Sequence, residues 1–242
     1  MTCFFHLVGR FGNLLFIYAH ARAYCEREGL DLCLPPWIGE MIFDIPLAVR
    51  PSGNRKADKV MPEEMHQNQD ALIYTCKQVR EWFKIRPTVL EQLQPILKDR
   101  KPVLLDVRMG DDLVGAGMVS LGRQCYLDAA IRAGYPGHDC EWEIDTSPTR
   151  LFTHFAGDVN ASGLNTTWVS LPAFYRMMTA QVHFRANSTF SWWAATLGDA
   201  KVYSPVIRGM QGGVPNQYCA NFVEGNWPVM ADTHPNTDLH LA

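Results

Sequence analysis

Short apolar segments alternate with longer helix-like segments along most of the chain, and this alternation limits the possible folds. The short segments are typical of buried strands, and the longer ones of the helices that cover them. Because repeated strand–helix units build a parallel sheet with helices on both faces, the sequence predicts an α/β fold. Strands are expected at 2–8, 30–34, 70–75, 102–107, 150–155, 167–171, 181–185 and 201–204, and helices at 14–28, 88–98, 124–133, 172–180 and 191–197.

Glycine and proline residues mark where several of these elements begin and end. Gly29 follows the Ala-rich helix at 14–28, for which Asn13 is the expected N-cap. Pro95 lies inside the helix at 88–98 and is expected to end it early. The segment 35–64 is rich in Pro and Gly and is therefore expected to be surface loop.

The chain has 242 residues, which suffices for one large domain or two small ones. The charged segment 98–101 is closed by Pro102, and a new strand is expected directly after it. A domain boundary is therefore predicted near residue 100. Residues 1–100 are expected to form an N-terminal domain and residues 101–242 a C-terminal one.

Composition excludes several classes of protein. The net charge of −3 argues against nucleic acid as a partner, because nucleic-acid-binding proteins usually carry a basic excess. No apolar run reaches about 18 residues and the N-terminus lacks a signal-peptide pattern, so no transmembrane segment is expected. Seven cysteines without a C-x-x-C spacing are typical of reduced thiols, which favours a cytoplasmic location. The oligomeric state stays open.

The turn at 9–13 is the first candidate for a binding site. Gly9 and Gly12 let the backbone approach a ligand closely, and the helix that starts near Asn13 favours an anion at its N-terminus. The spacing is neither a P-loop nor the G-x-G-x-x-G of NAD-binding proteins, which counts against a dinucleotide-binding fold. The alternative is an ordinary turn between a strand and a helix.

A second candidate is the end of the strand at 102–107. Arg108 follows this strand directly, and an arginine fork is well suited to hold a phosphate group. Asp111 and Asp112 lie in the loop just beyond it. The alternative is a cluster of surface ion pairs.

A third candidate lies between the strand at 181–185 and the helix at 191–197. Small polar side chains gather there, next to helix N-terminal N–H groups, and such a group can hold a diphosphate. Plain N-capping would account for one of these residues but not for all of them. The segment contains Asn187, Ser188, Thr189, Phe190 and Ser191, and it continues into Trp192 and Trp193, which are expected in the core.

Two further observations concern single residues. Asp158 follows the strand expected at 150–155, where it could accept hydrogen bonds from a ribose or base, or cap a turn. His6, His154 and His183 lie in expected strands and are interpreted as core residues. No histidine pair has metal-ligand spacing, so no metal site is predicted.

These motifs together resemble the α-1,2-fucosyltransferases of glycosyltransferase family 11. Residues 9–19 resemble the G-x-x-G-N-x-x-F-x-Y-A opening of that family, and residues 106–111 look like its H-x-R-R-G-D segment. Residues 186–195 resemble its S/A-N-S-S/T-F-S-W-W-x-A segment. Weaker family signals fit 126–130 and 155–158 in the same order, so the resemblance runs from residue 9 to about residue 205.

The resemblance implies a GT-B-like fold, with two Rossmann-like domains whose parallel sheets face a cleft. It implies an inverting transfer of fucose from GDP-fucose to a glycan hydroxyl, without a metal or another cofactor. By position, Arg108 would hold the donor β-phosphate, residues 187–191 would line the diphosphate pocket, and Asp158 would lie near the nucleoside. The turn with Gly9, Gly12 and Asn13 would face the sugar.

The catalytic base is assigned by position alone. Inversion requires that the acceptor hydroxyl loses its proton as it attacks, and a carboxylate is the usual base. Asp111 is the first candidate and Asp112 the second. Together with Arg108 they form the predicted catalytic set.

Two residues depart from the family pattern. Asp106 stands where the family has His, and Met109 stands where it has a second Arg. Another arginine could supply the positive charge that Met109 lacks, and the candidates are Arg10, Arg123 and Arg185. The departures also leave two alternatives open, namely a different nucleotide-sugar donor, or an inactive module that binds a nucleotide or glycan.

Overall fold

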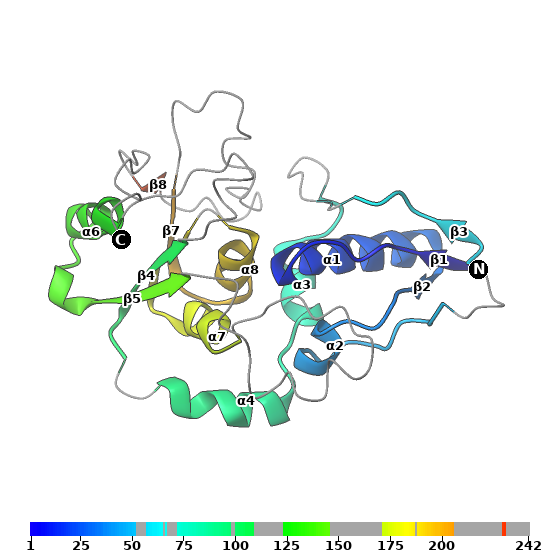
Figure 1. The fold of residues 1–242 in the computed structure, drawn as a ribbon, viewed down its shortest axis with the longest axis horizontal. Coiled ribbons are helices and arrows are strands. Elements are labelled where there is room, and N and C mark those ends of the chain that lie inside the picture. Colours follow the sequence, from blue (N-terminus) through cyan, green and yellow to red (C-terminus); the bar gives the residue numbers. More distant parts are fainter. Residues whose placement is uncertain are drawn as a thin grey trace. The chain divides into compact units, whose positions relative to one another are not determined.

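The protein is described from a computed structural model, in which the chain divides into two compact units. Among the described residues, the first unit lies within Met1–Gln94 and the second begins at Pro95. Figure 1 shows the elements of both units along the chain. The structure describes residues 1–51, 57–64, 66, 72–97, 100–108, 123–145, 171–186, 188–205 and 229–230.

The first unit is built on a three-stranded parallel sheet with the strand order β2-β1-β3. In the register of β1 with β2, Thr2 pairs with Asp31 and Phe4 with Cys33. The chain thus begins with a β–α–β unit, as the sequence predicted. The unit contains β1 (Thr2–Phe4), α1 (Phe11–Glu28), β2 (Asp31–Cys33), α2 (Gly39–Ile42), β3 (Lys59–Val60), α3 (Cys76–Trp82) and α4 (Pro87–Leu93).

Helix α1 starts earlier than the sequence suggested. Its N-cap is Arg10, and the Asn13 N–H donates to the Arg10 carbonyl at 2.8 Å. Asn13 therefore lies in the first turn, and its predicted role as N-cap is wrong. The other end is confirmed: Gly29 adopts the left-handed conformation at φ 65°, and its N–H donates to the Cys25 carbonyl.

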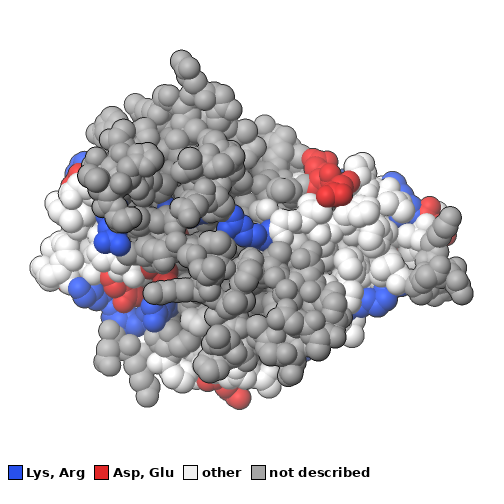
Figure 2. Space-filling model, viewed as in Figure 1, with Lys and Arg blue, Asp and Glu red and all other residues white. Residues whose placement is uncertain are grey.

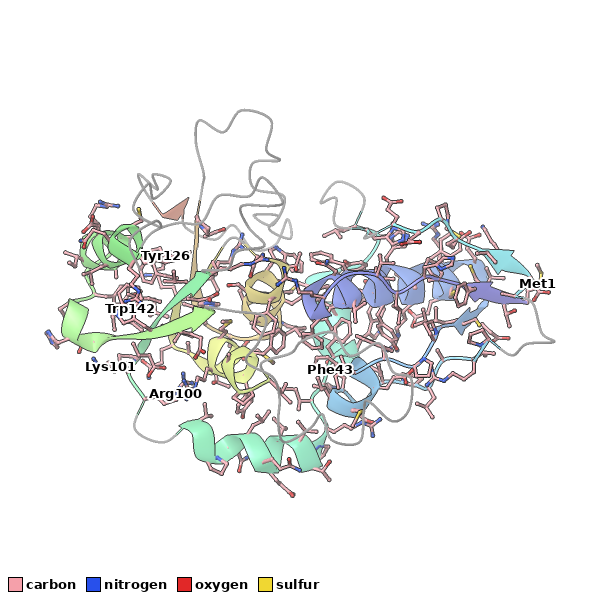
Figure 3. All side chains as sticks on the ribbon, in the orientation of Figure 1. Met1, Phe43, Arg100, Lys101, Tyr126 and Trp142 are labelled. Atoms are coloured by element: carbon pink, nitrogen blue, oxygen red, sulfur yellow. The ribbon has the colours of Figure 1, made fainter. Side chains whose placement is uncertain are left out.

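The interior of the first unit is aromatic and surrounds α1. Most side chains of α1 from Phe11 to Ala19 are buried, as expected of a helix that is covered on several sides. The Tyr18 ring lies 5.2 Å from Trp37 and 5.6 Å from Phe83, measured between ring centres. Phe43, labelled in Figure 3, packs edge-on against Phe83 at 5.1 Å. These contacts join α1 to the segments around α2 and α3.

The second unit is built on a five-stranded parallel sheet with the strand order β5-β4-β6-β7-β8. Its first strand, β4, lies inside the sheet, and the chain adds β5 on one side and β6 on the other. The α/β class with parallel sheets is thereby confirmed, and the arrangement is consistent with a Rossmann-like fold. The unit contains β4 (Val103–Arg108), α6 (Arg123–Arg132), β5 (Cys140–Asp145), α7 (Leu171–Thr179), β6 (Val182–Phe184), α8 (Thr189–Leu197), β7 (Lys201–Pro205) and β8 (Val229–Met230).

One face of this second sheet is apolar. Leu105 and Val107 of β4 and Phe184 of β6 are buried in one cluster with Tyr126 and Ala130 of α6. Tyr126 is labelled on α6 in Figure 3. Burial of this face against α6 supplies the main hydrophobic core of the unit.

The opposite face of the same strands is polar. Asp106 of β4 and His183 of β6 are buried, although each lies between apolar neighbours in the sequence. Side chains alternate between the two faces of a strand, so these residues face away from α6. Arg176 of α7 donates to Glu143 of β5 on this face at 3.1 Å. Figure 1 shows α7 and α8 on the side of β4 that is opposite to α6.

Several predicted elements differ from the structure. No strand occurs at 72–75, the described part of the expected strand at 70–75. There Thr75 and Gln78 form a capping box that starts α3, a helix that the sequence reading missed. Strand β5 was also missed, and Leu171 begins α7 instead of ending a strand. The early end expected at Pro95 is confirmed, because α4 ends at Leu93 and a short 3₁₀ turn follows.

Helix length and charge bear on membrane insertion. The helix α1 has 18 residues, among them Arg22, Glu26, Arg27 and Glu28. Charged side chains in such numbers oppose burial in a bilayer. Within the described part of the chain, no helix combines the length and the apolar character that a membrane crossing requires.

Gly198→Ala is expected to destabilise the protein more than Gly29→Ala. A Cβ at Gly198 would lie 2.1 Å from the Met178 carbonyl oxygen, so α7 and α8 must shift, which should cost about 2 kcal/mol or more. At Gly29 no atom lies within 4 Å of the added Cβ, and the left-handed backbone alone should cost about 1 kcal/mol. Denaturant unfolding of both variants measures the difference, and a larger loss in Gly29→Ala would contradict the packing argument.

Candidate functional site

The topology of the second sheet identifies one edge as the candidate site. In doubly wound sheets, ligands bind beyond the carboxyl ends of two adjacent strands from which the chain continues in opposite directions. Strands β4 and β6 form this pair, because β4 leads to β5 on one side and β6 leads to β7 on the other. The residues at these two ends are Arg108 of β4 and the turn that joins β6 to α8.

A buried hydrogen bond ties the two strand ends together. The Ala186 N–H donates to Asp106 Oδ2 at 3.1 Å, and Ser191 Oγ lies at the same distance from this nitrogen. Asp106 is 2% exposed, and Ala186 and Ser191 are also buried. The turn after β6 is therefore held to β4 two residues before Arg108.

The first turn of α8 contains most of the polar residues that the sequence singled out. Ser188 is the N-cap of α8, and its Oγ accepts a hydrogen bond from the Ser191 N–H at 3.0 Å. Ser188 and Thr189 are buried, and Phe190 is half-buried with its ring edge-on to Phe174. The start of α8 thus offers backbone N–H groups beside a serine hydroxyl.

The Ser191 hydroxyl serves the fold. Ser191 is fully buried and its Oγ accepts from the Ala186 N–H. The side chain therefore stabilises the turn, whereas the sequence reading placed it among the ligand-binding groups. Trp192 and Trp193 are both fully buried, which confirms their predicted place in the core.

Arg108 is the cation at the end of β4. It is half-buried and pairs in register with Asp145 of β5, whereas the last paired residue of β6, Phe184, lies opposite Leu105. Strand β4 therefore extends three residues beyond the last pair with β6. Arg108 lies on the same face as Asp106, because the two are separated by one residue.

The three arginines considered as replacements for a second cation differ in position. Arg185 is fully buried and donates from Nη1 to the Ala186 carbonyl at 3.0 Å, so it stabilises the turn. Arg123 is exposed at the start of α6. Arg10 is the N-cap of α1 in the first unit. Of these, Arg185 is closest to the candidate site in the sheet, but its burial keeps its guanidinium inside the protein.

Charged residues on the polar face are arranged in pairs. Arg100 pairs with Glu141, Arg176 pairs with Glu143, and His183 Nε2 lies 3.6 Å from Asp106 Oδ2. Basic and acidic side chains are also adjacent on the visible surface of this unit (Figure 2). Burial raises the pKa of the Glu143 carboxyl above its ordinary value, while Arg176 acts in the opposite direction. Such pairing is what makes buried charges tolerable.

The glycine turn belongs to the first unit. Gly9 has φ 82°, and a Cβ there would lie 2.2 Å from Asn13 Nδ2. Gly12 is buried in the first turn of α1, and Asn13 is half-buried. The conformation of Gly9 and its close approach to Asn13 thus require glycine for structural reasons.

Several predicted site residues lie outside the described part of the chain. The group comprises Met109, Asp111, Asp112, Asp158 and Asn187. In the described ranges, no three His, Cys, Asp or Glu side chains are grouped so that they could hold a metal ion. Of the predicted site residues, the structure therefore places Arg108 at the end of β4 and Ser188 at the start of α8, which follows the adjacent strand β6.

Comparisons with known proteins add no assignment. No family model matches the chain, and no curated protein or solved structure matches it either. The geometry at the ends of β4 and β6 and the motifs in the sequence are the observations that bear on function.

The sequence reading missed the buried polar groups that support the site. It interpreted Asp106 only as a departure from a family pattern and His183 as an isolated core residue. The available signal was the alternation of charged and apolar residues in two buried strands, Asp106-Val107-Arg108 and His183-Phe184-Arg185. Strands buried on both faces of a parallel sheet are usually apolar throughout, so this alternation indicates a specialised face.

Ser188→Ala is expected to lower the free energy of unfolding by about 1 kcal/mol, because α8 loses the acceptor for the Ser191 N–H. Ser188→Thr keeps an acceptor hydroxyl at the N-cap and should lose less than half as much. Denaturant unfolding of both variants measures the two values. Equal losses would show that the cap does not stabilise α8.

Proposed function

We propose that the protein is an inverting glycosyltransferase that moves fucose from GDP-fucose to a hydroxyl of a glycan acceptor, as α-1,2-fucosyltransferases do. One observation carries this proposal. Arg108 and the N-terminus of α8 lie at the adjacent carboxyl ends of β4 and β6, the position where doubly wound sheets bind nucleotides. These residues also belong to the two motifs that resemble the fucosyltransferase family.

The described residues suit a diphosphate. The guanidinium of Arg108 can donate two parallel hydrogen bonds to phosphate oxygens. The N-terminus of α8 adds about half a positive charge from the aligned peptide dipoles of the helix. The Ser188 hydroxyl, which accepts from the Ser191 N–H, can donate its own proton to a further oxygen. Together they stabilise the negative charge that grows on the diphosphate as the sugar leaves, and such electrostatic effects reach several kcal/mol.

The remaining roles in the proposal come from the resemblance, except that of the catalytic base, which is assigned by position in the chain alone. Asn187 would complete the diphosphate pocket, and Asp158 would lie near the nucleoside. Asp111, or else Asp112, would take the proton from the acceptor hydroxyl. The first unit would face the sugar with Gly9, Gly12 and Asn13, as a GT-B-like arrangement of the two sheets requires.

A second candidate function is supported by the two departures from the family pattern. Asp106 accepts a hydrogen bond inside the fold, so it does not replace a histidine that touches ligand. Met109 brings no positive charge where the family has a second arginine. A site with fewer cations fits another nucleotide-sugar donor, or a module that binds a nucleotide or glycan without turnover.

Titration of the protein with GDP tests the proposal, with UDP and NAD as controls and EDTA present throughout. Arg108→Ala is expected to raise the Kd for GDP about 10- to 100-fold, because hydrogen bonds between charged groups contribute about 1.5–3 kcal/mol. Transfer from GDP-fucose should be abolished while the thermal unfolding midpoint stays near that of the wild type.

Arg132→Ala is the matched control for Arg108→Ala. Arg132 is an exposed arginine in the last turn of α6 in the same unit, and its loss should change neither binding nor transfer. Equal turnover in Arg108→Ala and in the wild type would refute the role of Arg108. Tighter binding of UDP or NAD than of GDP would favour a different donor.

Transfer is expected to continue at full rate in excess EDTA. The proposed stabilisation of the leaving diphosphate uses Arg108 and the start of α8 and no divalent ion. Rates with EDTA, and with EDTA followed by excess Mg²⁺ or Mn²⁺, measure the metal dependence. A complete loss that added cation reverses would contradict this mechanism.

A further inference from the structure

We infer that Asp106 is a positioning residue, which fixes the anion-binding turn at the start of α8 to the strand that carries Arg108. The inference deepens the proposed function and rests on it for the identity of the ligand. Its structural basis is the hydrogen bond of 3.1 Å from the Ala186 N–H to Asp106 Oδ2, which joins residues 80 positions apart.

Both polar backbone groups of Ala186, its N–H and its carbonyl, form hydrogen bonds that hold the turn after β6. The Ala186 N–H is shared between Asp106 and the Ser191 hydroxyl, and the Ala186 carbonyl accepts from Arg185 Nη1 at 3.0 Å and from the Ser188 N–H at 2.9 Å. Within this network, Asp106 is the member that comes from a different strand. The other described bonds hold the turn to itself, to α8 and, through the Arg185 N–H and the Tyr203 carbonyl at 3.0 Å, to β7, so Asp106 is its described link to β4.

The position of Asp106 explains why it acts through the turn and not on a ligand. Its side chain is 2% exposed and lies two residues before Arg108 on the same face of the sheet. A carboxylate at the surface of an anion site would repel a phosphate group. Buried, and hydrogen-bonded to a backbone N–H, it instead sets where the N-terminus of α8 lies relative to Arg108.

The Asp106 carboxylate is buried, accepts a hydrogen bond from the Ala186 N–H and has a histidine nearby. His183 Nε2 lies 3.6 Å from Oδ2, and both ring nitrogens of His183 lack a hydrogen-bond partner among the described residues. A buried carboxylate without partners would be strongly destabilising, so its retention here indicates a specific contact. At the position where the family has a histidine, this chain therefore has an aspartate with a structural role.

Two substitutions of Asp106 separate the effect of its hydrogen bond with the Ala186 N–H from the other effects of this side chain. Asp106→Asn keeps an oxygen that can accept from the Ala186 N–H, whereas Asp106→Leu fills the space without an acceptor. We expect the Kd for GDP to stay within about threefold of the wild type in Asp106→Asn and to rise about tenfold or more in Asp106→Leu. Rescue by asparagine marks a positioning role through this bond.

Val202→Ala is the matched control for lost stability. Val202 is buried on β7, pairs in register with His183 and carries no polar side-chain group. Its variant should lower the unfolding midpoint and leave the Kd for GDP within about threefold of the wild type. If Asp106→Leu does not fold, Asp106→Ala, which also lacks an acceptor, takes its place. Wild-type affinity in the variant without an acceptor, or an equal loss in Asp106→Asn, would overturn the inference.

Hydrogen exchange of the Ala186 amide keeps this test independent of the ligand. Exchange should accelerate about tenfold in Asp106→Leu and stay near the wild-type rate in Asp106→Asn. The Gly198 amide, which donates to the Ala194 carbonyl at the other end of α8, is the internal reference. Failure of the wild type to bind GDP would contradict the proposed function alone, whereas an unchanged Ala186 rate in Asp106→Leu would contradict the positioning role.

Discussion

The hydrogen bond between the Ala186 N–H and the Asp106 carboxylate is the contact on which the geometry of the site depends. Strands β4 and β6 stop pairing at Leu105 and Phe184, so the ladder between these two strands does not reach Arg108 or Ser188. Beyond that point, the Asp106 side chain is the described link between the end of β4 and the turn after β6. A short, buried bond to a charged acceptor holds them with little freedom of movement, because no water competes for it.

The need to hold the ends of β4 and β6 together explains why one face of the second sheet carries polar side chains. One face is apolar and packs on α6, and this packing provides the hydrophobic stabilisation that a domain of this size needs. The other face can then carry Asp106, His183 and Glu143, each near a group of opposite or complementary character. Contacts of this kind rarely add much net stability, so their presence here is better explained by the arrangement of the site than by the strength of the fold.

Local signals made much of the fold predictable from the sequence. Apolar runs and glycines identified β1, α1, β4 and α8, and the place of Arg108 at the end of β4 followed directly. Strand β5 was missed because charged residues interrupt its apolar ones, and α3 because its capping box was overlooked. The role of Asp106 could not be predicted, since its partner Ala186 lies 80 residues away and only the pairing of β4 with β6 brings them together.

The same geometry limits which positively charged groups are available at the candidate site. Arg185 is buried and bound to the turn, so under the proposed function the positive charge that the described residues supply to a ligand would come from Arg108 and the α8 N-terminus. A diphosphate gains a negative charge when its sugar leaves. A fixed arginine fork interacts more strongly with that state than with the intact donor, which is the condition for catalysis. Under the proposed function, rigid placement of α8 relative to Arg108 would therefore contribute to catalysis directly.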